Sequence, residues 1–509
     1  MIKFNKQAVG VKTSAVLLSR IVSATIALFF VPVYIKLLGV ESYGLVAFYL
    51  LLVSVLVLID FALSTALSRQ VVILRARNEP EKSIKDLVFS MEIIYAGISL
   101  LIFVIIYLFA EKISLYWLKA DELPPERLKT SIRYIGILVA LQFPSSIYNG
   151  VMISLDKQIL NSVISIIINV LKAVGVILVL KIFAPVIENY FIWQILITVC
   201  SVILLRYFVW KEISTTKLRP VFSMLQLNPI KAFAFGMFGV TIVNFLLSMV
   251  DKLVVSNLVM LNLVACYSLA FQLSSVMGQV ITPLQSTVFP KFTALLTQNN
   301  YEVCTRLYHK SCKWVALIIW PLGLILFFFA EDILMAWTGN AFVTANTAPV
   351  LQIVSIGTIF NCLMFVPYIF MLSHGKTKFT IILNIVGAII FLPWLFWSIP
   401  KYGILGASFI WLAINLFYFL IGIPLFHRLF MKKELLNWYV KDNLFPFLAA
   451  IILLGTAKAL RVNTAFFDAP LNFILLISLF GIIYVYMMPE LRELSFKVLK
   501  IKKQDKAIT

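Results

Sequence analysis

The chain has 509 residues, of which 61% are hydrophobic and 13% are charged, and its formal net charge is +20. Soluble domains contain about 25% charged residues, so this composition excludes a soluble globular protein and a disordered chain. The five cysteines form no Cys-x-x-Cys pair, so neither a disulfide scaffold nor a metal site is expected. A β-barrel would show short alternating segments instead of the long apolar runs present here. The sequence therefore predicts an all-α polytopic membrane protein.

Fourteen apolar segments along the chain are candidates for transmembrane helices, each of which needs about 20 residues to cross a bilayer. In chain order, their cores lie at 15–38, 45–66, 87–110, 132–154, 160–183, 190–210, 233–257, 265–289, 314–331, 348–372, 379–399, 405–427, 445–460 and 471–489.

The Lys and Arg residues are spread unevenly over the connections between these segments. With the N-terminus inside, the inner connections carry roughly three times as many of them as the outer ones. This bias predicts that both termini are cytoplasmic. The positive net charge is therefore explained by topology and by attraction to anionic membrane lipids, and nucleic acid is not expected as a partner.

Three short motifs recur in the two halves of the chain at offsets of 218 to 224 residues. The pairs are Tyr43–Phe48 with Tyr267–Phe271, Phe143–Pro144 with Val366–Pro367, and Phe191–Trp193 with Phe409–Trp411. Each pair falls in corresponding helices of two sets of six. The pattern predicts two six-helix lobes in a parallel pseudo-twofold repeat, which is typical of transporters, with the substrate between the lobes.

This repeat divides the chain into five parts. We expect an N-lobe at residues 1–212, a cytoplasmic linker at 213–232 and a C-lobe at 233–428. Two extra C-terminal helices follow at 429–490, and a basic cytoplasmic tail at 491–509 ends the chain.

Several predicted helices carry polar residues at helical spacing. The helix at 160–183 has Asn169 and Lys172 on one such stripe, and the helix at 233–257 has Asn244. The helix at 265–289 carries Gln272 and Gln279, while Gln142, Ser145 and Asn149 form a stripe at 132–154. A single stripe is better explained by hydrogen bonds between helices. Stripes in both halves favour a shared hydrated cavity that binds the substrate.

Ionisable residues within the predicted helices are a sharper signal, because each costs at least about 2.5–3.5 kcal/mol at the bilayer centre. Lys172 lies near mid-depth, and no carboxylate of its own helix is within one turn. The candidate cations for substrate binding are Arg20, Lys172 and Lys252. The candidate carboxylates for exchange of a proton or sodium ion are Asp60, Glu92 and Asp251.

Structural alternatives exist for most of these groups. Arg20, Asp60 and Glu92 lie at similar depth and could form an ion-pair cluster, while Asp251 and Lys252 could form a helix-packing pair. For Lys172 a structural role would need a carboxylate on a neighbouring helix.

The sequence contains no catalytic constellation, so the chain is not expected to be an enzyme and no cofactor is expected. Its three histidines, His309, His374 and His427, are expected at cytoplasmic helix ends without a carboxylate partner. No Walker A motif is present, which indicates an electrochemical gradient as the energy source.

Four stretches carry a family resemblance: Leu37–Leu45, Asp60–Arg69, Ser248–Leu253 and Ala265–Ala270. They resemble the O-antigen and polysaccharide flippases, a group within the multidrug/oligosaccharidyl-lipid/polysaccharide exporter superfamily. The resemblance implies a two-lobed protein of the bacterial inner membrane that moves an undecaprenyl-pyrophosphate-linked oligosaccharide outward by alternating access through a cationic cavity. It further implies a polysaccharide polymerase and a chain-length protein as candidate partners. Asp60 departs from the family pattern, because many relatives have a small residue there.

Three other functions remain open from the sequence. A peptidoglycan-precursor flippase and a multidrug exporter belong to the same superfamily, and a membrane polysaccharide polymerase is also polytopic. The longest predicted outer loop, 111–131, has no histidine, which disfavours the polymerase. Lys172 favours an anionic substrate such as a pyrophosphate over the cationic substrates of many drug exporters.

Overall fold

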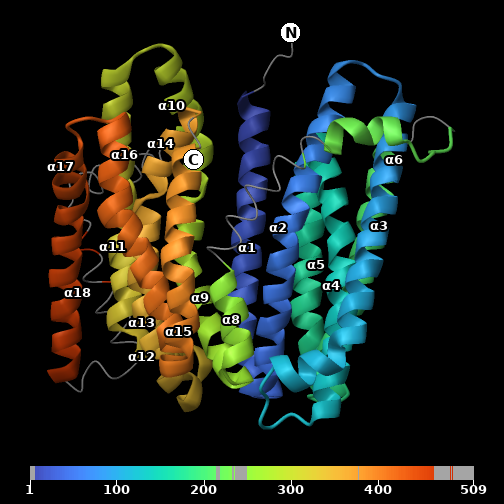
Figure 1. Cartoon of the computed structure of the whole chain (residues 1–509), viewed down its shortest axis with the longest axis horizontal. Helices are drawn as coiled ribbons and strands as arrows, with labels where there is room; N and C mark the ends of the chain where they lie inside the picture. Colours follow the sequence, from blue (N-terminus) through green and yellow to red (C-terminus); the bar gives the residue numbers. More distant parts are fainter. Residues whose placement is uncertain are drawn as a thin grey trace, which may run out of the picture. The chain divides into compact units, whose positions relative to one another are not determined.

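The computed structural model describes residues 6–213, 218–231, 249–375 and 378–463, together with Ala234, Ser478, Ile482 and Tyr484. Within these residues the chain is helical apart from short connections, and one isolated bridge between Lys119 and Met260 is the only strand-like pairing. This architecture confirms the all-α prediction (Figure 1).

The chain forms two compact units. The first comprises Met1–Leu269 and Asn384–Ala407, and the second comprises Ala270–Leu383 and Ser408–Thr509. The helices of the first unit are α1 (Lys6–Leu38), α2 (Val40–Ala76), α3 (Glu81–Lys112), the π-helix η1 (Ile113–Trp117), α4 (Pro125–Ser154), α5 (Gln158–Ile182), α6 (Ile187–Ile213), α8 (Val250–Leu258) and the start of α9 (Leu261–Ile281).

The second unit contains the rest of α9 and the helices that follow it, except for the middle of α15. These helices are α10 (Pro283–Thr297), α11 (Tyr301–Phe328), α12 (Ala330–Thr338), α13 (Ala341–Leu363), α14 (Phe365–Ser373), α15 (Lys378–Phe417), η2 (Tyr418–Gly422), α16 (Ile423–Phe430), α17 (Leu435–Asn437), η3 (Trp438–Leu444) and α18 (Phe445–Asn463).

Ten helical stretches of the described residues are long and apolar enough to cross a membrane. One of them, Lys378–Phe430, contains both predicted segments 379–399 and 405–427, and its backbone leaves helical geometry between them at Gly403 (φ 58°). The predicted segment 15–38 lies in α1, whose shorter apolar part is Val22–Leu38. The segments 233–257 and 471–489 fall largely outside the described residues.

Local sequence explains where several helices begin and end. Proline at N1 of α4 is favourable, because Pro125 already has a helical φ and its missing N–H would be unpaired there anyway. Gly39 separates α1 from α2 with a φ of 85°, which a side chain would strain. Asn340 caps α13 by accepting from the Val343 amide at 3.0 Å.

Each unit has its own apolar core around one central helix. In the first unit α4 packs against α2, α3 and α6, and α5 packs against α1 and α6 (Figure 1). In the second unit α11 packs against α13, α14 and α18. The central helices hold fixed positions relative to several neighbours, so α4 is a rigid platform for polar side chains.

A buried carboxylate fixes one end of the first unit. Glu41, in the first turn of α2, is 3% exposed and accepts hydrogen bonds from the backbone amides of Asp121, Glu122 and Leu123 at 2.9, 2.8 and 3.3 Å. The neighbouring Lys119 carbonyl accepts from the Leu261 amide at 2.8 Å. The connection after η1 is therefore held by both α2 and the start of α9.

The second unit contains a histidine between two carboxylates. His309 on α11 lies 2.6 Å from an oxygen of Asp442 in η3 and 2.9 Å from an oxygen of Glu434. The expectation that no histidine has a carboxylate partner is therefore wrong. Both partners lie more than 120 residues further along the chain, so sequence spacing could not reveal them.

Glu434 lies between two membrane-spanning stretches, and its environment stabilises the ionised form. Hydrogen bonds from the Asn437 amide and from His309 hold the pKa of this carboxyl below its usual range. The contribution of Glu434 to stability is therefore present above the usual carboxyl range and is lost as the pH falls through the lowered pKa.

We expect Glu41→Ala to lower the free energy of unfolding by about 1–3 kcal/mol, because the amides of residues 121–123 lose the buried carboxylate that accepts from all three. Thermal unfolding of the purified protein measures this loss. Glu122→Ala is the control, since its exposed side chain is removed while its amide remains. Equal melting temperatures for the two variants would contradict the prediction.

We expect His309→Ala to destabilise the protein by about 1–3 kcal/mol, since two carboxylates lose their shared partner. Adding Asp442→Asn should restore part of the stability by removing one of the unpaired charges. Lys310→Ala, an exposed neighbour on the same helix, serves as the control. A double variant no more stable than His309→Ala would show that charge is not the cause.

Candidate functional site

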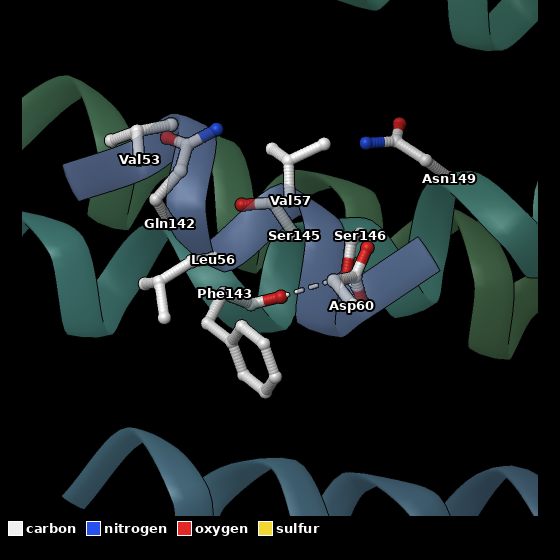
Figure 2. A pocket seen from close by; sticks show the side chains of 9 residues that line it. All are labelled: Val53, Leu56, Val57, Asp60, Gln142, Phe143, Ser145, Ser146 and Asn149. Atoms are coloured by element: carbon white, nitrogen blue, oxygen red, sulfur yellow. Dashed lines mark hydrogen bonds between the residues drawn. The ribbon is translucent and has the colours of Figure 1, made fainter. Parts of the chain in front are cut away.

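A partly open cavity of about 170 Å³, lined by both polar and apolar side chains, lies between α2 and α4 of the first unit. Asp60 is its one charged lining residue. The other lining residues are Val53, Leu56 and Val57 from α2 and Gln142, Phe143, Ser145, Ser146 and Asn149 from α4. Figure 2 shows Asp60 beside Ser146, with Gln142 and Asn149 at opposite ends of the group. The stripe predicted at 142, 145 and 149 therefore faces a cavity.

Asp60 is buried in this cavity and is held by hydroxyl groups. It accepts hydrogen bonds from Tyr95 on α3 at 2.6 Å and from Ser146 at 2.5 Å. In the described part of the chain, no basic side chain forms an ion pair with it. A carboxylate held only by neutral donors in an apolar setting gains strongly from binding a proton or a small cation.

Glu92 has a different environment. The Arg206 guanidinium donates to both carboxylate oxygens, at 3.1 and 3.2 Å, and Tyr148 and Trp210 donate at 2.9 and 2.8 Å. This bidentate pair, with two further donors, fully satisfies the carboxylate. Arg20 belongs to α1, and its side chain is not among those that the structure describes. Its predicted cluster with Asp60 and Glu92 therefore stays a prediction.

Lys172 on α5 is partly buried, and its ammonium lies 3.5 Å from the side-chain oxygen of Gln142. No carboxylate within the described ranges forms an ion pair with it. The same Gln142 lines the cavity that contains Asp60. The structure therefore connects the mid-helix lysine to the cavity through one amide.

Asn169, one turn from Lys172, donates to the Ser23 hydroxyl of α1 at 2.8 Å. This contact joins two helices, as the structural explanation of a polar stripe requires. The stripe on α5 thus combines a hydrogen bond between helices at Asn169 with a cation near the cavity at Lys172.

The remaining predicted residues lie elsewhere. Asp251, at the start of α8, accepts from the Tyr267 hydroxyl at 2.7 Å and lies 3.7 Å from the Lys252 ammonium. Gln279 on α9 is exposed and lies 3.4 Å from Ser275, while Gln272 on the same helix is half-buried. Asn244 lies outside the described residues.

Two hydroxyl groups that hold Asp60 were missed by the sequence-based prediction. Ser146 and Tyr95 hold the Asp60 carboxylate, yet Tyr95 lies within an apolar run. The spacing of Ser146 four residues after Gln142 is the signal that could have placed it on the cavity face. Nothing in the sequence pairs Tyr95 with Asp60.

Comparison with known proteins agrees with this architecture. A family model described as "Polysaccharide biosynthesis protein" matches residues 33–346, which is more than half of the chain. A Shigella flexneri protein named for O-antigen transport is 22% identical over 384 residues, which cover 74% of this chain and 87% of that protein. The succinoglycan biosynthesis transport protein ExoT of Rhizobium meliloti (strain 1021) is 24% identical over 351 residues, which cover 69% and 66% of the two chains.

Solved structures share the fold. The lipid II flippase MurJ in an inward closed conformation has a TM-score of 0.71 and 17% identity, over 96% of this chain and 99% of that one. An inward-facing multidrug resistance MATE family transporter of the MOP superfamily has a TM-score of 0.62 and 13% identity, over 81% and 96%. These likenesses confirm the predicted transporter fold.

The relatives found by sequence are named as transport proteins, which confirms the prediction of a transporter over an enzyme such as a polymerase. By its family match over residues 33–346, this multi-pass membrane chain belongs to the polysaccharide biosynthesis protein family.

Proposed function

We propose that this protein is a flippase for an undecaprenyl-pyrophosphate-linked oligosaccharide, the repeat unit of O-antigen or a related surface polysaccharide. The observation that carries the proposal is Lys172, an ammonium within a membrane helix whose described partner is the neutral Gln142. The family match and the names of the relatives from Shigella flexneri and Rhizobium meliloti support the substrate class.

The chemistry of the cargo explains the need for such a cation. A pyrophosphate carries negative charge that is costly to move through hydrocarbon, and a partly desolvated ammonium attracts it more strongly than it would in water. Arg20 and Lys252 are further candidate cations. The amides of Asn169, Asn244, Gln272 and Gln279 suit the hydroxyl groups of a sugar chain.

The remaining parts of the proposal concern direction and placement. The Lys and Arg bias supports cytoplasmic termini. The resemblance to the polysaccharide flippases supports a place in the bacterial inner membrane and transport from the inner to the outer leaflet. The repeat supports lobes at 1–212 and 233–428 that alternate access to the cargo. A polymerase and a chain-length protein remain the proposed partners on the biosynthetic route.

A peptidoglycan-precursor flippase is the second candidate, because the fold matches the lipid II flippase MurJ over nearly the whole chain. Its cargo carries the same pyrophosphate, so Lys172 fits both. A multidrug exporter for cationic compounds fits less well, since it would place a substrate cation near an ammonium that has no carboxylate partner among the described residues.

Ion coupling is assigned first to Asp60 among the three candidate carboxylates. Glu92 is satisfied by Arg206, and Asp251 lies beside Lys252 and accepts from Tyr267. Asp60 lines a cavity and accepts only from hydroxyl groups, so it is the carboxylate best placed to exchange a proton or sodium ion between conformations.

We expect Lys172→Ala to reduce translocation of labelled undecaprenyl-pyrophosphate oligosaccharide in proteoliposomes at least about tenfold, which corresponds to about 1.4 kcal/mol in the barrier. Lys172→Arg should keep much of the activity, because either cation attracts a phosphate. Lys181→Ala, exposed in the last turn of the same helix, is the matched control. Full transport by Lys172→Ala at normal abundance would refute the role.

We expect Asp60→Asn to remove the dependence of transport on a sodium or proton gradient, since an amide cannot exchange either ion. Transport rates with and without each imposed gradient measure the effect. Glu92→Gln is the comparison variant and should lower stability while keeping the gradient dependence. If Asp60→Asn responds to the gradients as the unmodified protein does, the coupling role belongs to another residue.

A further inference from the structure

Gln142 is related to both charged groups of the proposed function, the Lys172 ammonium and the Asp60 carboxylate. Its side-chain oxygen is 3.5 Å from the Lys172 ammonium, and the side chain also lines the cavity that contains Asp60 (Figure 2). Asp60, Gln142 and Lys172 come from three different helices, α2, α4 and α5. Within the described residues, Gln142 is the side chain through which the lysine reaches the cavity.

The bond between Gln142 and Lys172 is suited to exchange. A distance of 3.5 Å is at the long limit for a hydrogen bond, so little free energy is lost when it breaks. The glutamine amide has an acceptor oxygen and donor hydrogens on one flexible side chain. It can therefore turn its oxygen from the ammonium to a cation in the cavity without any movement of α4.

We propose that Gln142 couples occupation of the Asp60 cavity to the availability of Lys172 for an anionic pyrophosphate headgroup. This inference rests on the proposed function for the roles of Lys172 and Asp60. Gln142 acts here as a positioning residue, because it works through the lysine and does not itself need to touch the cargo.

The sign of the coupling follows from the charges. A sodium ion that enters the cavity attracts the Gln142 oxygen that lines it, so Lys172 loses its neutral partner and binds an anion more readily. A proton on Asp60 removes the negative charge that repels the anion and frees the Ser146 and Tyr95 hydroxyls to reorient. Both cations therefore strengthen pyrophosphate binding, and by linkage the pyrophosphate strengthens cation binding by the same factor.

The test measures binding of farnesyl pyrophosphate to the purified full-length protein by calorimetry. One series raises sodium at constant pH and ionic strength with choline as the replacement, and the other lowers the pH without sodium. We expect the dissociation constant of the unmodified protein to fall about three- to tenfold in at least one series. A rise in the dissociation constant in both series, or no change in either, would overturn the coupling.

Gln142→Met keeps the length of the side chain and removes the amide. We expect this variant to bind farnesyl pyrophosphate with an affinity that depends less on sodium, while its dependence on pH stays close to that of the unmodified protein. Gln352→Met in the second unit is the matched control, because Gln352 is also a glutamine of a membrane helix and donates one hydrogen bond, to the Phe327 carbonyl at 3.2 Å. Unchanged sodium dependence in Gln142→Met would refute the role of Gln142.

Gln142→Glu provides an independent readout that does not depend on how well Gln142→Met folds. It gives Lys172 a permanent carboxylate partner, so we expect weaker pyrophosphate binding at every sodium concentration. Binding equal to that of the unmodified protein would contradict the contact. Lys172→Ala separates the two proposals. If this variant binds farnesyl pyrophosphate normally, the proposed function fails. If it loses binding while Gln142→Met keeps the full sodium dependence of binding, only the present inference is overturned.

Discussion

The cost of placing charge in hydrocarbon is the constraint on which the polar interior of this protein depends. Each ionisable group within a membrane helix must form an ion pair, form hydrogen bonds, or take part in binding the substrate or an ion. Glu92 is fully paired by Arg206, while Asp60 is held by hydroxyl groups and Lys172 by a single amide. Of these three groups, the two without an ion pair are thus an anion and a cation; Gln142 contacts the cation and lines the cavity that contains the anion. A protein that only needed a stable bundle would gain nothing from this arrangement.

The membrane also explains why the fold could be predicted so fully from sequence. A chain in hydrocarbon must satisfy its backbone internally, so long apolar runs can only be helices. Even the break in the long stretch Lys378–Phe430 was visible, because the polar gap between segments 379–399 and 405–427 contains Gly403. The tertiary pairs were not visible. Arg206 lies 114 residues from Glu92, and Asp442 lies 133 residues from His309. The spacing of residues shows which face of a helix a residue lies on, but it does not show which other helix packs against that face.

In the candidate site, too, the cost of burying a charge identifies residues from the sequence, whereas helix packing determines their surroundings. Lys172 and Asp60 could be selected from sequence, since a charge inside an apolar run needs a reason. Their different environments could not be predicted, because they arise from how α2, α4 and α5 pack in the first unit. Polar stripes were ambiguous for the same reason: Asn169 bonds to α1, whereas Gln142, on a similar stripe, faces a cavity. An uncharged polar residue costs little free energy in a membrane helix, so its presence does not distinguish a hydrogen bond between helices from a place in a cavity.

The hydrogen bonds around Glu41 bear on the order in which the chain can mature during synthesis. The carboxylate leaves the ribosome about 80 residues before the amides of residues 121–123 that it binds. Lys119 and Trp117 in turn bind Leu261 and Ser256, which are made later still. The newly inserted α1–α2 hairpin therefore carries a carboxylate without its final amide partners until the next hairpin arrives. The contacts of the N-terminal half are complete only after the first residues of the second half have been translated. Biogenesis of this protein thus requires synthesis past the middle of the chain before its first helices reach their final contacts.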